Sequence, residues 1–238
     1  MKKGLVSVTF RQLDCAEIIK LCVSEGFGYI EWGGDIHVPS GDTDKAKAVA
    51  AFCRDAGIVP VGYGSYYNAA DDMSRFYPAL NTAEALGADY VRIWAGRSRE
   101  YDRLAEENIR FAVEEAVSRG IAVSLECHRG TMTEDPELAV MLAKSTGCKL
   151  HFQPNPDIDF EDNLHTLDIF SPYLCAIHVF AWERGDIRLP LSSHKEQWIK
   201  YARNAPDVPF LLEFVEGNKT DNLISDAQTL AEIAAAVD

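Results

Sequence analysis

The chain has 238 residues, 47% of them hydrophobic and 25% charged, so it is long enough to bury a sizeable core. Its formal net charge of -14, with Lys and Arg scattered rather than clustered, argues against a nucleic-acid or anionic membrane partner. A small-molecule partner is therefore favoured.

The six cysteines form no C-x-x-C pair and lie mostly in apolar segments, as is typical of free thiols in a reducing compartment. Residues 1–14 contain too short an apolar run for a signal peptide, and no stretch is long enough to span a membrane. We therefore expect a cytoplasmic protein. No linker divides the chain, so residues 1–238 are expected to form one domain; the oligomeric state stays open, and a homo-oligomer is one option.

Short β-branched or aromatic runs recur about every 30 residues, and each is followed by a stretch with helical spacing. The predicted strands are 5–10, 29–32, 59–64, 90–95, 121–127, 149–153, 175–180 and 209–215. The predicted helices are 14–25, 43–56, 72–86, 101–119, 136–146, 161–170, 195–204 and 221–236. This alternation is typical of βα units, and eight of them favour a closed (β/α)8 TIM barrel.

The helix boundaries support this division of the chain. Thr43 is expected to cap the helix 43–56, and Asp135 with Pro136 to begin the helix 136–146. A doubly wound open sheet is the alternative, but the segment 10–14 lacks the glycine-rich turn of that fold. Five glycines each follow a helical stretch, where a left-handed residue is wanted: Gly26, Gly57, Gly87, Gly120 and Gly147.

In a TIM barrel the functional residues lie at the C-terminal ends of the strands. Glu126 and Glu213 each follow an apolar run. Burying a carboxylate without a partner costs roughly several kcal/mol, so each needs a cation or hydrogen bonds. The strands 121–127, 149–153, 175–180 and 209–215 are neighbours in a barrel, so Glu126, Gln153, His178 and Glu213 should converge. This oxygen and nitrogen set suits one divalent ion of Mn, Mg, Co or Zn. The alternative is an ion-pair network without metal, in which the two carboxylates pair with Arg92 or His128.

Five motifs carry a resemblance that extends over essentially the whole chain: YIEWGGD, SLECHRG, LHFQPNPD, AIHVFAW and FLLEFVEG. With these motifs the sequence resembles the sugar phosphate isomerase/epimerase superfamily, the xylose-isomerase-like TIM barrels. The resemblance implies a metal held by Glu, Asp, His and Glu from the last four barrel strands. Glu126, His178 and Glu213 match three of these positions.

The fourth position departs from the family pattern. Gln153 stands where the family has Asp; its amide oxygen can bind a metal but brings no charge. Asp157 is the other candidate, although Pro154 and Pro156 stiffen the loop that would have to bring it back.

The resemblance implies an isomerase or epimerase that acts on a sugar or sugar phosphate through an enediolate. Glu126 and Glu213 would serve as the base and the acid. One alternative is a metal-dependent dehydratase of an inosose or polyol, and another is a degenerate barrel that binds sugar without catalysis. DNA repair of the AP-endonuclease type is disfavoured by the acidic charge and by the small number of histidines. Five further residues are expected to bind substrate: Glu31, Arg92, His128, Trp182 and Arg188.

Overall fold

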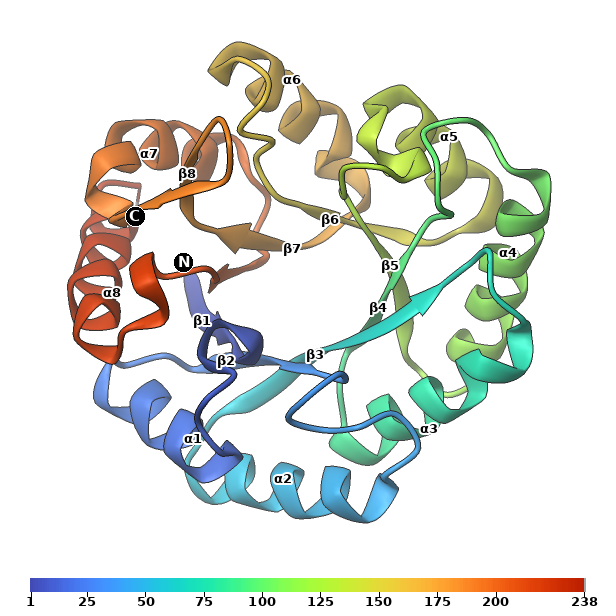
Figure 1. Cartoon of the computed structure of the whole chain (residues 1–238), viewed down its shortest axis with the longest axis horizontal. Helices are drawn as coiled ribbons and strands as arrows, with labels where there is room; N and C mark the ends of the chain where they lie inside the picture. Colours follow the sequence, from blue (N-terminus) through green and yellow to red (C-terminus); the bar gives the residue numbers. More distant parts are fainter. Residues whose placement is uncertain (238) are drawn as a thin grey trace.

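The computed structural model describes residues 1–237 and has a closed barrel at its centre. Eight parallel strands follow one another in the order β1-β10-β7-β6-β5-β4-β3-β2, and the helices form a ring around them (Figure 1). The first strand pairs with the last, with Lys2 opposite Pro209. The predicted (β/α)8 TIM barrel is therefore confirmed.

The barrel strands are β1 Lys2–Val6, β2 Tyr29–Gly33, β3 Val59–Asn68, β4 Tyr90–Trp94, β5 Ala122–Glu126, β6 Lys149–Phe152, β7 Leu174–Val179 and β10 Pro209–Leu212. The prediction for the first strand was displaced: Ser7–Phe10 is a 3-10 helix, and the strand begins at Lys2. At this point the Ser7 hydroxyl accepts a hydrogen bond from the Gly33 amide at 2.9 Å. A short antiparallel hairpin, β8 Ala181–Glu183 and β9 Ile187–Leu189, was not predicted.

The helices are α1 Cys15–Ser24, α2 Thr43–Asp55, α3 Phe76–Leu86, α4 Arg103–Val117, α5 Pro136–Thr146, α6 Phe160–Phe170, α7 Lys195–Asn204 and α8 Thr220–Ala235. The five glycines predicted at the junctions all have positive φ. The cap of α2 was predicted wrongly: the Asp42 carboxylate, rather than Thr43, accepts from the Lys45 amide. The Asp135 cap of α5 is confirmed, since its carboxylate accepts from the Leu138 amide.

The barrel interior contains both an apolar cluster and a group of buried polar side chains. Residues two apart on a strand point to the same side, and both sides of a parallel barrel strand are buried. The buried residues of the apolar cluster are Val6, Val8, Val61, Tyr90, Ala176 and Leu211. The buried polar residues nearer the C-terminal ends of the strands are Glu31, Arg92, Glu126, His151, His178 and Glu213.

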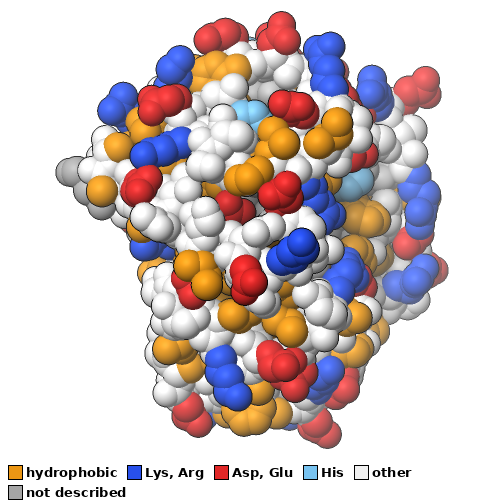
Figure 2. All heavy atoms as spheres, turned by 60° about the vertical axis from the view of Figure 1, so that its left-hand side comes forward, with side chains coloured by type: hydrophobic (Ala, Val, Ile, Leu, Met, Phe, Trp, Pro, Cys, Tyr) orange, Lys and Arg blue, Asp and Glu red, His pale blue; other side chains and the backbone are white. Residues whose placement is uncertain are grey.

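The described surface carries both signs of charge. On the face shown in Figure 2, acidic and basic side chains are interspersed, and neither sign covers a large continuous area. Within residues 1–237, every helix is too short or too polar to cross a membrane.

Candidate metal centre

Arg92 holds two carboxylates inside the barrel. Its Nε donates to Oε1 of Glu31 at 2.9 Å, and its Nη1 donates to Oε2 of Glu126. Tyr90 donates to the other oxygen of Glu31 at 2.7 Å, and the Trp94 indole donates to Oε2 of Glu126 at 2.5 Å. Both oxygens of Glu31 thus accept hydrogen bonds, whereas Oε1 of Glu126 accepts none from residues 1–237.

Burial and charge act in opposite directions on this network. Burial raises the pKa of Glu31, but the positive charges of Arg92 and His178 outweigh it and hold the pKa well below its usual range. The carboxylates of Glu126 and Glu31 likewise outweigh burial and raise the pKa of Arg92. Glu31 and Arg92 are therefore ionised at neutral pH. Arg92 also pairs with Glu126, one of the two carboxylates in the ion-pair alternative.

His178 lies between two carboxylates. Its Nδ1 is 3.2 Å from Oε2 of Glu213, and its Nε2 is 3.5 Å from Oε1 of Glu31. Burial lowers the pKa of this imidazole, yet Glu213 and Glu31 raise it more, to about 10. The two carboxylates therefore stabilise a positive charge at His178, which a proton or a metal ion can supply.

Gln153 presents its amide oxygen to the same ring nitrogen. Its Nε2 donates to the backbone carbonyl of Cys127 at 2.8 Å, which leaves Oε1 at 3.4 Å from Nδ1 of His178. Asp157 is held elsewhere: its carboxylate is half exposed and accepts from Arg129 at 2.9 Å. Of the two candidates for the fourth ligand, Gln153 is the one that lies beside His178.

These atoms fit a divalent ion on the Nδ1 side of His178. Donors about 2.1 Å from one metal lie about 3.0 to 3.4 Å from each other in octahedral or tetrahedral geometry. The measured separations of 3.2 Å and 3.4 Å agree with this. Oε2 of Glu213 is buried and, across the described residues, has no hydrogen-bond donor. Nε2 of His178 faces Glu31, so Nδ1, which faces Gln153 and Glu213, is the nitrogen that could bind a metal. A carboxylate behind the other ring nitrogen is common at metal-binding histidines.

A second group of donors lies deeper in the barrel. One ligand atom each from Glu31, His151 and His178 lies within 4.8 Å of the others, and all three side chains are buried. Both oxygens of Glu31 already accept hydrogen bonds, one of them from Arg92, whose charge would repel a cation. This group therefore fits a metal less well than the Nδ1 side of His178 does.

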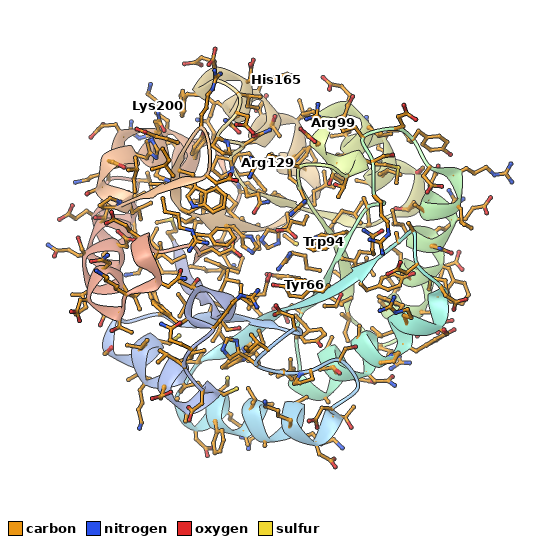
Figure 3. All side chains as sticks on the ribbon, in the orientation of Figure 1. Tyr66, Trp94, Arg99, Arg129, His165 and Lys200 are labelled. Atoms are coloured by element: carbon orange, nitrogen blue, oxygen red, sulfur yellow. The ribbon has the colours of Figure 1, made fainter. Side chains whose placement is uncertain are left out.

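A cavity of about 140 Å³ opens beside these residues. Glu126 and Gln153 line it together with His128, Trp182 and Phe214. The His128 ring lies 5.0 Å from the Trp94 ring, centroid to centroid. Seen along the barrel, Tyr66, Trp94 and Arg129 lie towards its centre, whereas His165 and Lys200 lie near the rim (Figure 3).

The other predicted substrate-binding residues are divided between the interior and the mouth. Glu31 is 0% exposed and Arg92 is 5% exposed, so both lie beneath the cavity. Trp182 lies on its wall, and Arg188 packs against Trp182 and Phe214 from the hairpin. The structure thus brings Gln153, His178 and Glu213 together directly, with Glu126 bordering the same cavity.

Three residues of this region were missed in the sequence. His151 precedes Gln153 by two residues, and Tyr90 precedes Arg92 by two, so strand alternation places each pair on one side and was a usable signal. Tyr66 was not detectable, because only the fold brings its ring beside Trp94, with 5.6 Å between the ring centroids. Its hydroxyl accepts from Arg11 at 3.0 Å.

The fold and these residues define a TIM barrel with a polar centre at the C-terminal ends of its strands. A family model described as the xylose isomerase-like TIM barrel matches residues 19–186, and the chain belongs to this family. No curated protein matches the sequence.

Solved structures of the same fold cover nearly the whole chain. The probable 3-DHS dehydratase AsbF from Bacillus anthracis is 17% identical, with a TM-score of 0.79, and 97% of this chain and 99% of that chain are covered. A xylose isomerase domain containing protein from Salmonella typhimurium LT2 is 10% identical, with a TM-score of 0.73 and coverage of 98% and 97%. A xylose isomerase-like TIM barrel protein from Mycobacterium smegmatis, in complex with magnesium, is 15% identical, with a TM-score of 0.68 and coverage of 96% and 92%.

Proposed function

We propose that the protein is a divalent-metal-dependent isomerase or epimerase that moves a proton next to the carbonyl group of a sugar or sugar phosphate. The observation that carries this proposal is the meeting of Gln153 Oε1, His178 Nδ1 and Glu213 Oε2, with separations of 3.2 Å and 3.4 Å around the imidazole. The M. smegmatis protein has the same fold and was solved in complex with magnesium, which supports the hypothesis that this protein's reaction depends on a metal.

Gln153, His178 and Glu213 would hold the ion, and Glu126 is the further predicted ligand. The ion, when bound, acts as a Lewis acid that polarises a substrate carbonyl and acidifies the neighbouring C–H. Glu126 is suited to proton transfer because Arg92 and Trp94 fix one of its oxygens while the residue borders the cavity. Glu213 supplies the second carboxylate, with Oε2 at 3.2 Å from Nδ1 of His178.

The test is proton exchange between substrate and solvent. Ketoses and ketose phosphates are incubated with the protein and Mn²⁺ in D2O, and proton NMR follows deuterium incorporation next to the carbonyl. We expect metal-dependent exchange that EDTA abolishes. Glu213→Gln should lower the rate by at least about 100-fold, the usual contribution of an acid–base group.

Glu114→Gln is the matched control, because Glu114 is an exposed residue of α4 and the change removes the same charge. It should exchange at the wild-type rate. Wild-type exchange by Glu213→Gln would overturn the catalytic assignment. Absence of Mn²⁺ binding in calorimetry would overturn the metal dependence.

Dehydration is the second candidate function. AsbF aligns over 97% of the chain with a TM-score of 0.79. Loss of water needs an acid near the leaving hydroxyl, and His128 borders the cavity beside Glu126. The same NMR experiment separates the two reactions, since a dehydration product shows a new olefinic proton or an enolisable CH2 group.

The cysteines bear on the cellular compartment of the protein. All six cysteines are free, which fits the reducing cytoplasm that we propose for this protein.

A further inference from the structure

Arg188 differs from the other arginines at the barrel mouth. Five arginines from the loops at this end each pair with a carboxylate: Arg11, Arg97, Arg99, Arg129 and Arg184. For Arg188, no ion pair is found anywhere in residues 1–237. In a chain with a net charge of -14, an arginine that forms no ion pair with the described residues has a cationic group available for a ligand.

The guanidinium of Arg188 is held in place by uncharged groups. Its Cζ lies 4.8 Å from the centre of the Phe214 ring and 5.6 Å from that of Trp182. Its Nη1 donates to the side-chain oxygen of Asn218 at 2.6 Å. Stacking and one hydrogen bond orient the group, while its remaining N–H donors stay free of carboxylates.

The backbone that positions Arg188 is in a costly conformation. Phe214 has a φ of 52° and Asn218 a φ of 53°, in the left-handed region that a bulky residue such as Phe rarely adopts. Phe214 directly follows Glu213, so the strained segment joins the candidate metal ligand to the residue that Arg188 stacks on. Strain of this kind concentrates at ligand sites.

Arg188 also lies within electrostatic range of Glu213. Burial lowers the pKa of Arg188, and the Glu213 carboxylate opposes that effect. A guanidinium nevertheless stays protonated at every physiological pH. The cation therefore lies near the centre where the substrate carbonyl would bind.

We propose that Arg188 binds an anionic group of the substrate, a carboxylate or a phosphate, while the carbonyl end faces Gln153, His178 and Glu213. This inference rests on the proposed function and narrows its substrate class to sugar acids and sugar phosphates. The planar guanidinium suits both anions, because it can donate two parallel hydrogen bonds to their oxygens.

The test is anion binding in the absence of metal, so that it does not depend on turnover. Inorganic phosphate and acetate are titrated separately into the wild-type protein by calorimetry. We expect one of them to bind, and its identity distinguishes a phosphate from a carboxylate substrate. Arg188→Met should weaken that binding by about 10- to 100-fold, the effect of losing a charge-assisted hydrogen bond.

Arg184→Met is the control from the same hairpin, because the Arg184 side chain is 72% exposed and its ion pair with Asp159 is 3.8 Å long. It should bind the anion like the wild type. Arg188→Lys keeps the charge but removes the planar guanidinium, so its anion affinity should lie between those of the wild type and Arg188→Met. This conservative variant keeps the test valid if Arg188→Met fails to fold. Equal affinity of the wild type and Arg188→Met, or binding of neither anion, overturns the inference.

The two proposals fail separately. If Arg188→Met binds anions normally while Glu213→Gln loses exchange, the substrate class is wrong and the function stands. If anion binding depends on Arg188 while no exchange and no Mn²⁺ binding are found, the anion site stands without the metalloenzyme.

Discussion

Gln153 occupies the position at which the family resemblance implies an aspartate ligand. An uncharged amide replaces the carboxylate that the family resemblance implies, and its oxygen still points to His178 because its nitrogen is tied to the Cys127 carbonyl. The expected cost is weaker electrostatic attraction for the metal, since only Glu213 among the three closest donors brings a charge.

Restoring the charge should therefore strengthen metal binding. We expect Gln153→Asp to lower the Kd for Mn²⁺ by roughly tenfold, about 1.4 kcal/mol, as measured by calorimetry. Asp157→Asn should leave the Kd unchanged, because Asp157 pairs with Arg129. A large loss of affinity in Asp157→Asn would transfer the ligand role to that residue.

Arg92 is expected to be the most stabilising of the charged residues inside the barrel. Arg92→Met leaves Glu31 and Glu126 buried without their cation, and breaking such a pair costs about 3–5 kcal/mol. Chemical denaturation should show this loss. Arg97→Met removes an ion pair whose arginine is 64% exposed, so it should cost less than about 1 kcal/mol. Similar losses in the two variants would refute this account of the network.

Part of the site was predictable from residue types alone. Glu126, His178 and Glu213 stand out because each interrupts an apolar strand, and they do lie at one end of the barrel. The sequence does not reveal which carboxylate Arg92 binds, because that depends on the spacing of β2, β4 and β5 across the interior. It likewise does not show which nitrogen of His178 faces Gln153.

At the scale of elements, the helices were more predictable than the strands. Their amphipathic spacing, capping residues and terminal glycines are local signals, and the boundaries of α5 and α7 agree with the prediction at both ends. The hairpin β8–β9 was not predicted because its strands have only three residues each, too few to show an alternating pattern. The first strand was displaced because Ser7–Phe10 is as buried as a strand would be.

The junction between the η5 turn Leu191–His194 and α8 provides a pH-dependent contact. Asp226 of α8 accepts a hydrogen bond from the Leu191 amide at 2.8 Å. Burial raises the pKa of Asp226 to about 6, although that hydrogen bond opposes the rise. The folded state therefore prefers the protonated form, and stability is lost as the pH rises from the unfolded value of 3.8 through 6.

Asp226→Asn keeps an acceptor for Leu191 and removes the charge. We expect its Tm to exceed that of the wild type by about 3 °C or more at pH 8, since each kcal/mol shifts the Tm by about 2–4 °C in a protein of this size. The gain should shrink as the pH falls from 6 towards 4. Differential scanning fluorimetry across this range measures it, and a gain that is constant with pH would contradict the assignment.

For the molecule as a whole, the pairing of β1 with β10 links the two ends of the chain. Lys2 lies opposite Pro209 and Leu5 opposite Leu212, so neither half of the barrel can close alone. We therefore propose that the chain folds as one domain.

One cooperative transition should follow. Far-UV circular dichroism and tryptophan fluorescence should give the same denaturation midpoint, because the tryptophans are distributed over β2, β4, β8 and α7: Trp32, Trp94, Trp182 and Trp198. Two midpoints separated by more than the experimental error would show that the barrel opens in parts.

The hairpin β8–β9 has a consequence for how this barrel can change its chemistry. It forms a two-stranded sheet of its own, separate from the barrel ladder. At its base, the Trp198 indole of α7 donates to the Phe180 carbonyl at 2.9 Å. We therefore expect a hairpin of another length or sequence to be accepted between β7 and α7 without a change in the barrel's strand register. Such an exchange would replace Trp182 and Arg188 together, so the proposed ligand preference could change while the barrel is kept.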